Sequence, residues 1–303
     1  MTLDPRARAF LEQQRDSGQP RLFEMTPEEA RAGAGPLAEL IGAGPGVDRV
    51  EDLTIPVAGG EIPARRYRPA DARGTIAWFH GGGWVVGDIE VSDSMCRMLA
   101  DSSRATVVSI GYRLAPEHPF PTPLEDCYAA LGFLAEHEAA PLVVGGDSAG
   151  GNLAAVCALR ARDRGGPELA AQVLVYPVTD TDTDTASYRE HGSNELPMLG
   201  TREMAWFFDH YLPDGADRTD PEVAPLRAAD LSRLPPALVV LAEYDPLRDE
   251  VLRYAERLEE AGVEVSLLRY DDQPHGFFGF VNIYPTGNVA VAEVGARLRA
   301  LLA

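Results

Sequence analysis

Three short motifs contain residue types that could perform acyl transfer, and they follow one another along the chain. Residues 80–83 read His-Gly-Gly-Gly, residues 146–150 read Gly-Asp-Ser-Ala-Gly, and residues 275–277 read His-Gly-Phe. Gly-x-Ser-x-Gly is typical of a sharp turn from a strand into a helix, where a side chain at either glycine would collide with its neighbours. The serine is the exposed residue of that turn, so Ser148 is the candidate nucleophile.

The residues around Ser148 favour this interpretation over an ordinary glycine-serine turn. Residues 139–144 are mostly apolar and predict a buried strand, while residues 149–164 have the apolar spacing of a helix. The strand-turn-helix context that the motif requires is therefore present. The first turn of such a helix has unpaired N–H groups, which makes the N–H of Ala149 a candidate donor to an oxyanion. The glycine run within residues 80–83 can direct further backbone N–H groups at the same oxygen.

A serine hydroxyl is a weak nucleophile at neutral pH, so Ser148 needs a base, and histidine is the side chain best matched to that proton transfer. After a serine at such a turn, the acid and then the histidine follow along the chain. Three of the six histidines lie downstream: His191, His210 and His275. The first two fall in a long insertion, whereas His275 lies in a loop, residues 272–276, directly after the last expected strand. We predict that His275 is the base.

The acid is expected after the penultimate strand, where the chain reads Glu-Tyr-Asp-Pro at residues 243–246. Aspartate followed by proline is also typical of the start of a helix, so a capping role competes with a catalytic role at Asp245. We predict Asp245 as the acid because it lies at the end of the strand, whereas Asp249 and Glu250 lie a turn into the next helix. Glu243 is the alternative if the strand ends earlier.

The elements that must position these residues alternate along most of the chain. Strand-like runs occur at residues 50–57, 62–67, 75–79, 105–110, 141–144, 172–176, 237–241 and 263–270. Helix-like stretches occur at residues 92–102, 123–138, 149–164, 246–261 and 289–302. From the third strand onward, this alternation predicts an α/β fold with a mostly parallel, eight-stranded sheet and helices on both faces. The first two strands are joined through Gly59-Gly60, so we expect them to pair antiparallel at one edge.

Two regions do not fit the alternation, residues 1–46 and residues 178–235. The first contains helical patterns, among them residues 27–39. The second separates two strands by far more than the roughly 2 to 6 residues of an ordinary connection, and insertions of this kind are usually functional or disordered. We expect both regions to pack together as a helical cap on a single domain, residues 1–303. The cap would cover the carboxyl edge of the sheet, where open α/β sheets bind their ligands.

Aromatic side chains near these regions are candidates for the substrate pocket. Trp84 directly follows the glycine run, and Trp206 and Phe207 lie on an amphipathic helix expected over residues 201–211. We predict that these three side chains limit the acyl pocket, so that short to medium acyl groups are preferred over long ones. The alternative is that the helix aromatics only pack the cap against the core, and the pattern favours neither interpretation.

The composition argues against several kinds of partner. There are 27 basic residues, all arginine, against 47 acidic residues, a net charge of -20, so nucleic acid and anionic membrane surfaces are not expected partners. The three cysteines, Cys96, Cys127 and Cys157, have no metal-ligand spacing and are expected to be buried free thiols. Residues 1–15 contain charges throughout and no apolar core of a signal peptide, so a cytoplasmic location is expected.

Two further segments complete a resemblance to a known family. Residues 112–121 read Tyr-Arg-Leu-Ala-Pro-Glu-His-Pro-Phe-Pro, and residues 245–250 read Asp-Pro-Leu-Arg-Asp-Glu. Together with the three motifs above, they resemble the hormone-sensitive-lipase family of carboxylesterases over about residues 75–280. Where that family often has glycine two residues before the proline of the acid loop, this chain has Tyr244.

The resemblance implies an α/β-hydrolase fold, a small-molecule ester substrate, and no metal or organic cofactor. It also implies oxyanion donors at Gly82 and Gly83 beside Ala149, and it agrees with Asp245 and His275 as the rest of the triad. Amides, lactones or acyl transfer to an alcohol are alternatives that the motifs do not separate. A non-catalytic ligand receptor is another, because the plant gibberellin receptor resembles this fold but has lost the histidine. A last strand with an exposed edge is compatible with a homodimer.

Overall fold

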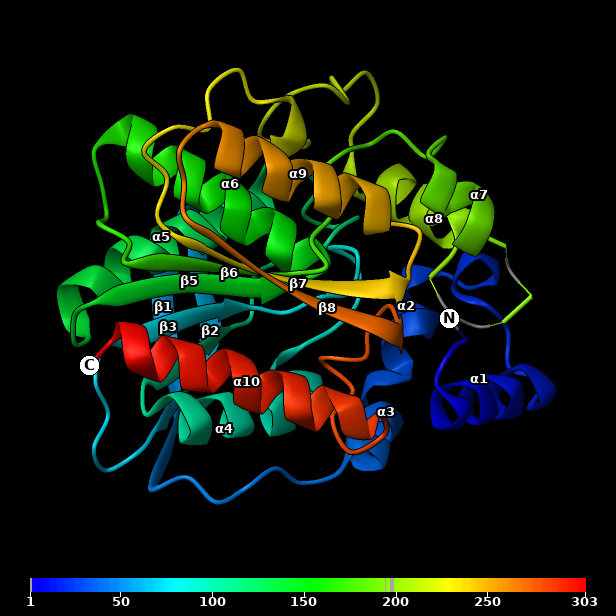
Figure 1. The fold of residues 1–303 in the computed structure, drawn as a ribbon, viewed down its shortest axis with the longest axis horizontal. Helices are drawn as coiled ribbons and strands as arrows, with labels where there is room; N and C mark the ends of the chain where they lie inside the picture. Colours follow the sequence, from blue (N-terminus) through cyan, green and yellow to red (C-terminus); the bar gives the residue numbers. More distant parts are fainter. Residues whose placement is uncertain (1, 194, 197–198) are drawn as a thin grey trace.

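The computed structural model describes residues 2–193, 195–196 and 199–303, and its centre is a single eight-stranded sheet (Figure 1). The strands are β1 (Arg49–Val57), β2 (Gly60–Arg68), β3 (Thr75–Phe79), β4 (Thr106–Ile110), β5 (Leu142–Asp147), β6 (Ala171–Val175), β7 (Ala237–Tyr244) and β8 (Val265–Pro274). Their order across the sheet is β1-β2-β4-β3-β5-β6-β7-β8. The predicted number of strands is confirmed.

Helices connect most of these strands. The α-helices are α1 (Pro5–Asp16), α2 (Pro27–Ala32), α3 (Ala34–Ile41), α4 (Ile89–Ser103), α5 (Thr122–His137), α6 (Ala149–Arg164), α7 (Ala186–His191), α8 (Thr201–Tyr211), α9 (Arg248–Glu260) and α10 (Pro285–Leu301). Two short 3-10 helices are η1 (Leu22–Glu24) and η2 (Pro225–Arg227). Among the described residues, none of the helices is long and apolar enough to span a bilayer.

The pairing of the strands brings the two glycine-rich motifs together. β1 and β2 form the predicted antiparallel hairpin, β2 pairs antiparallel with β4, and the remaining neighbours are parallel. In the parallel pair of β3 and β5, Phe79 lies opposite Gly146. Because parallel strands end at the same edge of a sheet, the loop that follows β3 and the turn that follows β5 leave the sheet side by side.

Both faces of the central strands are buried, which explains their continuous apolar runs. Along β3, Ala77 and Phe79 belong to the core beneath α5, α6 and α9, while Ile76 and Trp78 belong to the core beneath α4 and α10. Figure 1 shows these two helical layers on opposite sides of the sheet. The sheet is therefore a rigid platform, and its carboxyl edge is the place where side chains can leave the core.

The two regions outside the alternation lie near each other at that edge. Figure 1 shows α1, α2 and α3 and the helices α7 and α8 beyond the tips of β7 and β8. The indole N–H of Trp206 on α8 donates to the carbonyl of Met25 at 3.2 Å, and Arg21 forms an ion pair with Glu203. The guanidinium of Arg202 lies 3.7 Å from the ring centroid of Phe23. The first region and the insertion are thus in direct contact.

The helix expected over residues 27–39 is instead two helices, so that expectation was wrong in detail. α2 ends before Gly33, and α3 starts at the next residue. Pro36 has no N–H to donate to the turn before it, and proline is tolerated in the first turn of a helix, where no such bond is needed. Restarting the helix at Ala34 puts Pro36 in that position.

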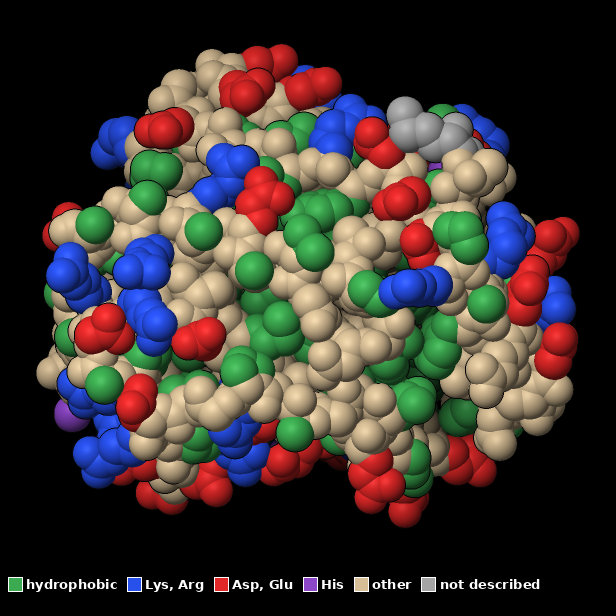
Figure 2. Space-filling view, turned by 60° about the horizontal axis from the view of Figure 1, so that its bottom comes forward, with side chains coloured by type: hydrophobic (Ala, Val, Ile, Leu, Met, Phe, Trp, Pro, Cys, Tyr) green, Lys and Arg blue, Asp and Glu red, His purple; other side chains and the backbone are tan. Residues whose placement is uncertain are grey.

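Charged side chains are dispersed over the surface. Figure 2 shows acidic and basic side chains interspersed on one face, with acidic side chains along its edges. Many arginines pair with carboxylates, as Arg65 does with Asp52 at 2.7 Å and with Glu90 at 2.8 Å. Exposed pairs of this kind contribute only about 0 to 1 kcal/mol each to stability. On this face the arginines do not gather into one basic patch.

Candidate active site

Ser148 occupies a strained turn between β5 and α6. Its φ of 55° and ψ of -119° lie outside the regions that L-residues ordinarily adopt, and its exposed fraction is 9%. A Cβ on Gly146 would lie 2.4 Å from the carbonyl of Gly150, and a Cβ on Gly150 would lie 1.9 Å from the carbonyl oxygen of Phe79. Both flanking positions therefore require glycine, for the steric reason that the motif predicted.

The structure brings the three predicted triad residues into one hydrogen-bonded chain. The His275 Nε2 atom lies 2.9 Å from the Ser148 Oγ atom, and the His275 Nδ1 atom lies 2.6 Å from the Asp245 Oδ2 atom. When the Nδ1–H group donates to Asp245, the Nε2 atom can accept the serine proton. Asp245 is fully buried and His275 is nearly so. The arrangement can remove a proton from the serine and stabilise the resulting imidazolium.

The two carboxylate oxygens of Asp245, the residue with competing capping and catalytic interpretations, have different partners. Oδ2 bonds to His275, while Oδ1 accepts the N–H of Leu247 at 2.9 Å, in the turn before α9. α9 begins at Arg248, two residues later than an Asp-Pro helix start at Pro246 would place it. One side chain therefore closes the turn and faces the histidine at the same time.

The other acidic candidates face elsewhere. Glu243 pairs with Arg248 at 2.9 Å and with Arg269 at 3.2 Å. Asp249 accepts the N–H of Ser187, and Glu250 accepts the N–H of Thr179, both from the insertion. These three carboxylates have other partners, and Asp245 is the carboxylate that bonds to His275.

The two strands that carry the acid and the base are longer than their apolar patterns suggest. β7 continues to Tyr244 and β8 to Pro274, where these two residues pair beyond an irregularity in the ladder. Asp245 and His275 are thus each the first residue after a strand. The prediction that a loop begins at residue 272 was wrong, since β8 continues to Pro274. Backbone pairing rather than apolar content sets the end of a strand.

One residue beside the base was not singled out from the sequence. Tyr176 follows β6, has a positive φ of 35° and is fully buried. Its ring centroid lies 4.5 Å from that of His275, and its hydroxyl accepts the N–H of Gly279 at 3.3 Å. Tyr176 therefore supports the imidazole and the loop that follows it. Its place at the carboxyl end of a central strand was the available signal.

The glycine run forms a compact turn beside Ser148. Gly82 and Gly83 have φ values of 117° and 58°, and the carbonyl of Gly82 accepts the N–H groups of Val85 at 3.1 Å and Val86 at 2.9 Å. A Cβ on Gly82 would lie 2.1 Å from the Val86 carbonyl oxygen. Glycine is required here both by the positive φ and by this close approach. We refer to residues 82–86 as the oxyanion turn.

The predicted pocket residues have three different surroundings. Trp84 is fully buried, and its ring stacks on that of Tyr211 at 4.2 Å, which places it between the oxyanion turn and α8. Phe207 lies against the turn itself, because a Cβ on Gly83 would lie 2.1 Å from its ring. Trp206 is partly exposed and bonds to Met25, as described above. Phe207 is therefore the one of the two α8 aromatics that contacts Gly83 of the oxyanion turn.

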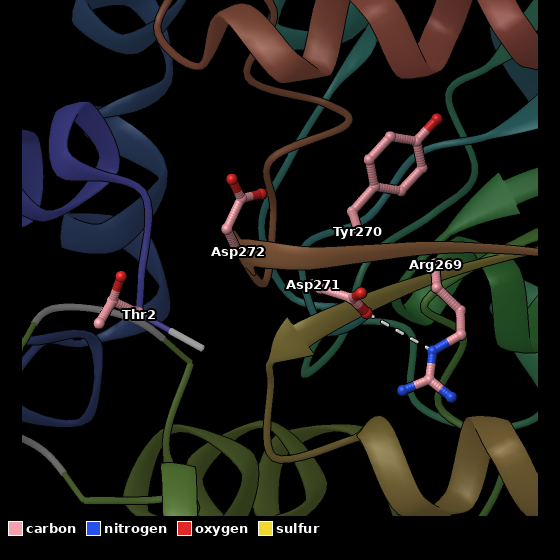
Figure 3. Close-up of a pocket in the computed structure, with 5 residues that line it drawn as sticks. All are labelled: Thr2, Arg269, Tyr270, Asp271 and Asp272. Atoms are coloured by element: carbon pink, nitrogen blue, oxygen red, sulfur yellow. Dashed lines mark ion pairs between the residues drawn. The ribbon is translucent and has the colours of Figure 1, made fainter.

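A surface pocket elsewhere contains none of the triad residues. It lies along β8 and is lined by Thr2 and residues 269–272 (Figure 3). Arg269 and Asp271 form an ion pair across it at 3.6 Å. Within the described part of the chain, no group of three or more histidine, cysteine, aspartate or glutamate side chains is arranged to hold a metal ion. Cys96, Cys127 and Cys157 are buried, and burial raises the pKa of each thiol.

Asp147, the residue before the nucleophile, was also not singled out from the sequence. Its Oδ1 atom accepts the N–H of Gly81 at 3.1 Å, which connects the elbow to the glycine run. Burial raises the pKa of the Asp147 carboxyl to about 6, although the nearby His275 and the N–H of Gly81 act in the opposite direction. The folded protein therefore favours the protonated form of the Asp147 carboxyl over the carboxylate more strongly than the unfolded chain does.

This pKa predicts a pH-dependent contribution to stability. A carboxyl with a raised pKa contributes stability at low pH that is lost as pH rises through about 6. We expect the free energy of unfolding of the wild type, relative to that of Asp147→Asn, to fall by about 1.4 kcal/mol between pH 5 and pH 8. Asparagine keeps an oxygen that can accept the Gly81 N–H. Urea unfolding of both proteins across this range measures the difference, and a constant difference would contradict the assignment.

Comparisons with known proteins agree with this geometry. The family model described as the alpha/beta hydrolase fold matches residues 76–279. The carboxylic ester hydrolase LipN of Mycobacterium tuberculosis is 43% identical over 268 residues, which cover 84% of this chain and 70% of LipN. An arylesterase of Saccharolobus solfataricus is 35% identical over 99% of both chains. The hyperthermophilic esterase of Pyrobaculum calidifontis has a similar structure, with a TM-score of 0.93, 41% identity and full coverage of both chains.

The chain therefore belongs to the α/β-hydrolase fold family. Within that family it is a carboxylesterase of the hormone-sensitive-lipase type, as its motifs predicted.

Proposed function

We propose that this carboxylesterase hydrolyses short to medium acyl esters through an acyl-enzyme on Ser148. The observation that supports this most is the chain of hydrogen bonds from the Ser148 Oγ atom through His275 to Asp245, at 2.9 and 2.6 Å. A serine activated in this way attacks an ester carbonyl, and the two-step route divides one difficult displacement into two easier ones.

In the first step, His275 accepts the proton of Ser148 while the serine oxygen bonds to the acyl carbon. Asp245 holds the imidazole with its Nε2 atom toward the serine and stabilises the imidazolium that forms. His275 then donates its proton to the departing alcohol, and the acyl group remains on Ser148. In the second step, His275 takes a proton from water while the water oxygen bonds to the acyl carbon. The bond to Ser148 then breaks, His275 returns the proton to the serine oxygen, and the acid leaves. His275 transfers each proton, and protein groups stabilise each charge, so the proposed reaction needs no cofactor.

The carbonyl oxygen becomes negatively charged in both tetrahedral intermediates. We assign its stabilisation to the N–H groups of Gly82, Gly83 and Ala149. Ala149 is the first residue of α6, where N–H groups have no partner within the helix and the helix dipole favours negative charge. Gly82 and Gly83 lie in backbone conformations that only glycine adopts easily. Donors that are already oriented before the reaction stabilise the developing charge without further reorganisation.

We propose that residues 1–46 and 178–235 form a cap on a single domain and limit the acyl pocket. The contacts of Trp206 with Met25 and of Arg21 with Glu203 support their joint packing, and the packing of Phe207 on Gly83 supports a position over the site. We also propose a cytoplasmic location and a homodimer. The dimer is supported by the place of β8 at one end of the sheet, although the N–H of Asp4 already bonds to the carbonyl of Asp272 on this strand.

A series of p-nitrophenyl esters of increasing acyl length tests the proposed substrate class. Each buried methylene contributes about 0.8 kcal/mol, so we expect kcat/KM to rise about fourfold per methylene until the acyl chain meets the wall of the pocket, and then to fall. Trp206→Ala should move that maximum toward longer chains. Product analysis with alcohols and amines as competing acceptors separates hydrolysis from acyl transfer.

Trp206→Phe is the matched control, because it keeps an aromatic ring and removes the hydrogen bond to Met25. It should lower stability slightly and leave the chain-length maximum in place. If Trp206→Ala lowers the melting temperature without moving the maximum, Trp206 packs the cap and another residue limits the acyl chain.

A further inference from the structure

Arg31, on α2, connects the first region of the chain to the turn that holds the oxyanion glycines. Its Nε–H donates to the carbonyl of Val85 at 2.8 Å, and one terminal nitrogen donates to the carbonyl of Ala115 at 2.5 Å. Both terminal nitrogens also bond to Glu117, at 2.7 and 2.8 Å. Arg31 lowers the pKa of the Glu117 carboxyl to about 2. The planar guanidinium thus makes four hydrogen bonds at once, more than the three N–H donors of a lysine could make.

Arg31 and Ala115 both donate hydrogen bonds to backbone carbonyls of the oxyanion turn. The N–H of Ala115 donates to the carbonyl of Trp84 at 3.0 Å, while Arg31 bonds to the carbonyls of Ala115 and Val85. The carbonyl groups of Trp84 and Val85, the two residues after Gly83, are therefore restrained from outside the turn. Such restraint is needed because glycine loses more conformational freedom than any other residue when its backbone is fixed.

The same stretch of chain also bonds to α8. Residues 21–31, which we refer to as the strap, carry Arg21, paired with Glu203, and Met25, whose carbonyl accepts the indole N–H of Trp206. Phe207, the next residue on α8, packs on Gly83. The oxyanion turn is thus contacted by the strap through Arg31 and by α8 through Phe207. Figure 1 shows α2 and α8 at the same end of the sheet.

We infer that Arg31 is a positioning residue for the oxyanion hole and that it sets the orientation of the Gly82 and Gly83 N–H groups through the Val85 and Ala115 carbonyls. The inference rests on the proposed function, which assigns these N–H groups to the oxyanion. Arg31 does not touch the substrate. Loss of a whole oxyanion donor typically costs 10²- to 10³-fold in turnover. Misorientation of two donors that are still present should cost less.

Arg31→Ala should lower kcat about 10- to 100-fold for p-nitrophenyl butyrate and leave KM within about threefold. It should also weaken inhibition by an alkyl trifluoromethyl ketone in parallel with kcat/KM, because the adduct of this ketone with Ser148 bears the oxyanion. Binding of the corresponding methyl ketone, which resembles the ground state, should change little. A purely structural role would lower the melting temperature and leave this discrimination intact when the assays are done well below melting.

Glu117→Gln is the matched control, because it weakens the exposed ion pair and keeps both carbonyl contacts of Arg31. Its kcat should stay within about threefold of the wild type. Arg31→Lys keeps the charge and can reach one carbonyl, so an intermediate kcat is expected. If Arg31→Ala does not fold, Arg31→Lys is the variant to compare with Glu117→Gln.

Two results would overturn the inference: equal losses in Arg31→Ala and Glu117→Gln, or unchanged trifluoromethyl ketone inhibition in both Arg31 variants. Failure of the proposed function looks different, because the wild type itself would then lack ester turnover and ketone inhibition.

Discussion

Replacing Ser148 with alanine is expected to lower ester turnover by roughly a millionfold, since removing the nucleophile of a comparable triad has a cost of that order. The variant should remain folded, because the substitution removes only one hydroxyl group. At this position 9% of the residue's surface is exposed to solvent. Residual hydrolysis would come from binding and the oxyanion donors alone. Steady-state kinetics with p-nitrophenyl acetate, with enzyme concentration raised for the variant, measures the loss.

Covalent labelling makes the same prediction independent of turnover. A fluorophosphonate should add one equivalent to the wild type, at Ser148 in the peptide map, and none to Ser148→Ala. Ser109→Ala is a suitable control, since Ser109 is a buried serine on β4 of the same sheet. Turnover by Ser148→Ala within a hundredfold of the wild type, or labelling at another serine, would mean that the nucleophile lies elsewhere.

Asp245→Asn is expected to lower turnover by about 10⁴-fold, because an asparagine can hold the histidine in the wrong tautomer. In that tautomer the Nδ1 atom of His275 carries no hydrogen atom, so the Nε2 atom carries it and cannot accept the serine proton. The fold should tolerate this change, since asparagine retains an oxygen for the N–H of Leu247. Kinetics and thermal unfolding should be measured on the same samples, so that a loss of turnover is separated from a loss of stability.

Glu243→Gln serves as the comparison, because Glu243 is the neighbouring carboxylate that pairs with Arg248 and Arg269 instead of the histidine. Its turnover should stay within a few-fold, and the loss of such pairs should cost about 1 kcal/mol of stability or less. If Asp245→Asn lowers the melting temperature but keeps turnover within a few-fold, its role is to close the turn before α9, and the acid lies elsewhere.

Local sequence determined the parts of the site in which neighbouring residues restrict one another. The flanking glycines at 146 and 150 are required by contacts within the strand-turn-helix unit itself, so the motif was sufficient to predict the elbow. The hairpin through Gly59-Gly60 and the alternation of strands and helices are local in the same sense. The expected order of the triad along the chain left three histidines, and the positions of Asp245 and His275 after strands made these two the predicted acid and base.

Strand ends and helix starts were less accurate, because they depend on partners. β7 and β8 extend past their apolar residues to pair Tyr244 with Pro274, and this pairing exists only when the two strands are adjacent. The dual role of Asp245 depends on the same adjacency. A capping role and a triad role compete as interpretations of the sequence, whereas in the structure one oxygen of Asp245 closes the turn before α9 and the other bonds to His275.

The sequence by itself therefore determined the fold class and the strand-turn-helix unit that carries Ser148, the predicted nucleophile, since these follow from short-range sterics and from periodicity. Only the tertiary structure decided which side chains surround the triad. Burial of Trp84, the raised pKa of Asp147 and the contact of Arg31 with Val85 each depend on segments far apart in the chain. Such contacts leave no periodic pattern, because burial and hydrogen bonding at one position are set by whichever segment the fold places beside it.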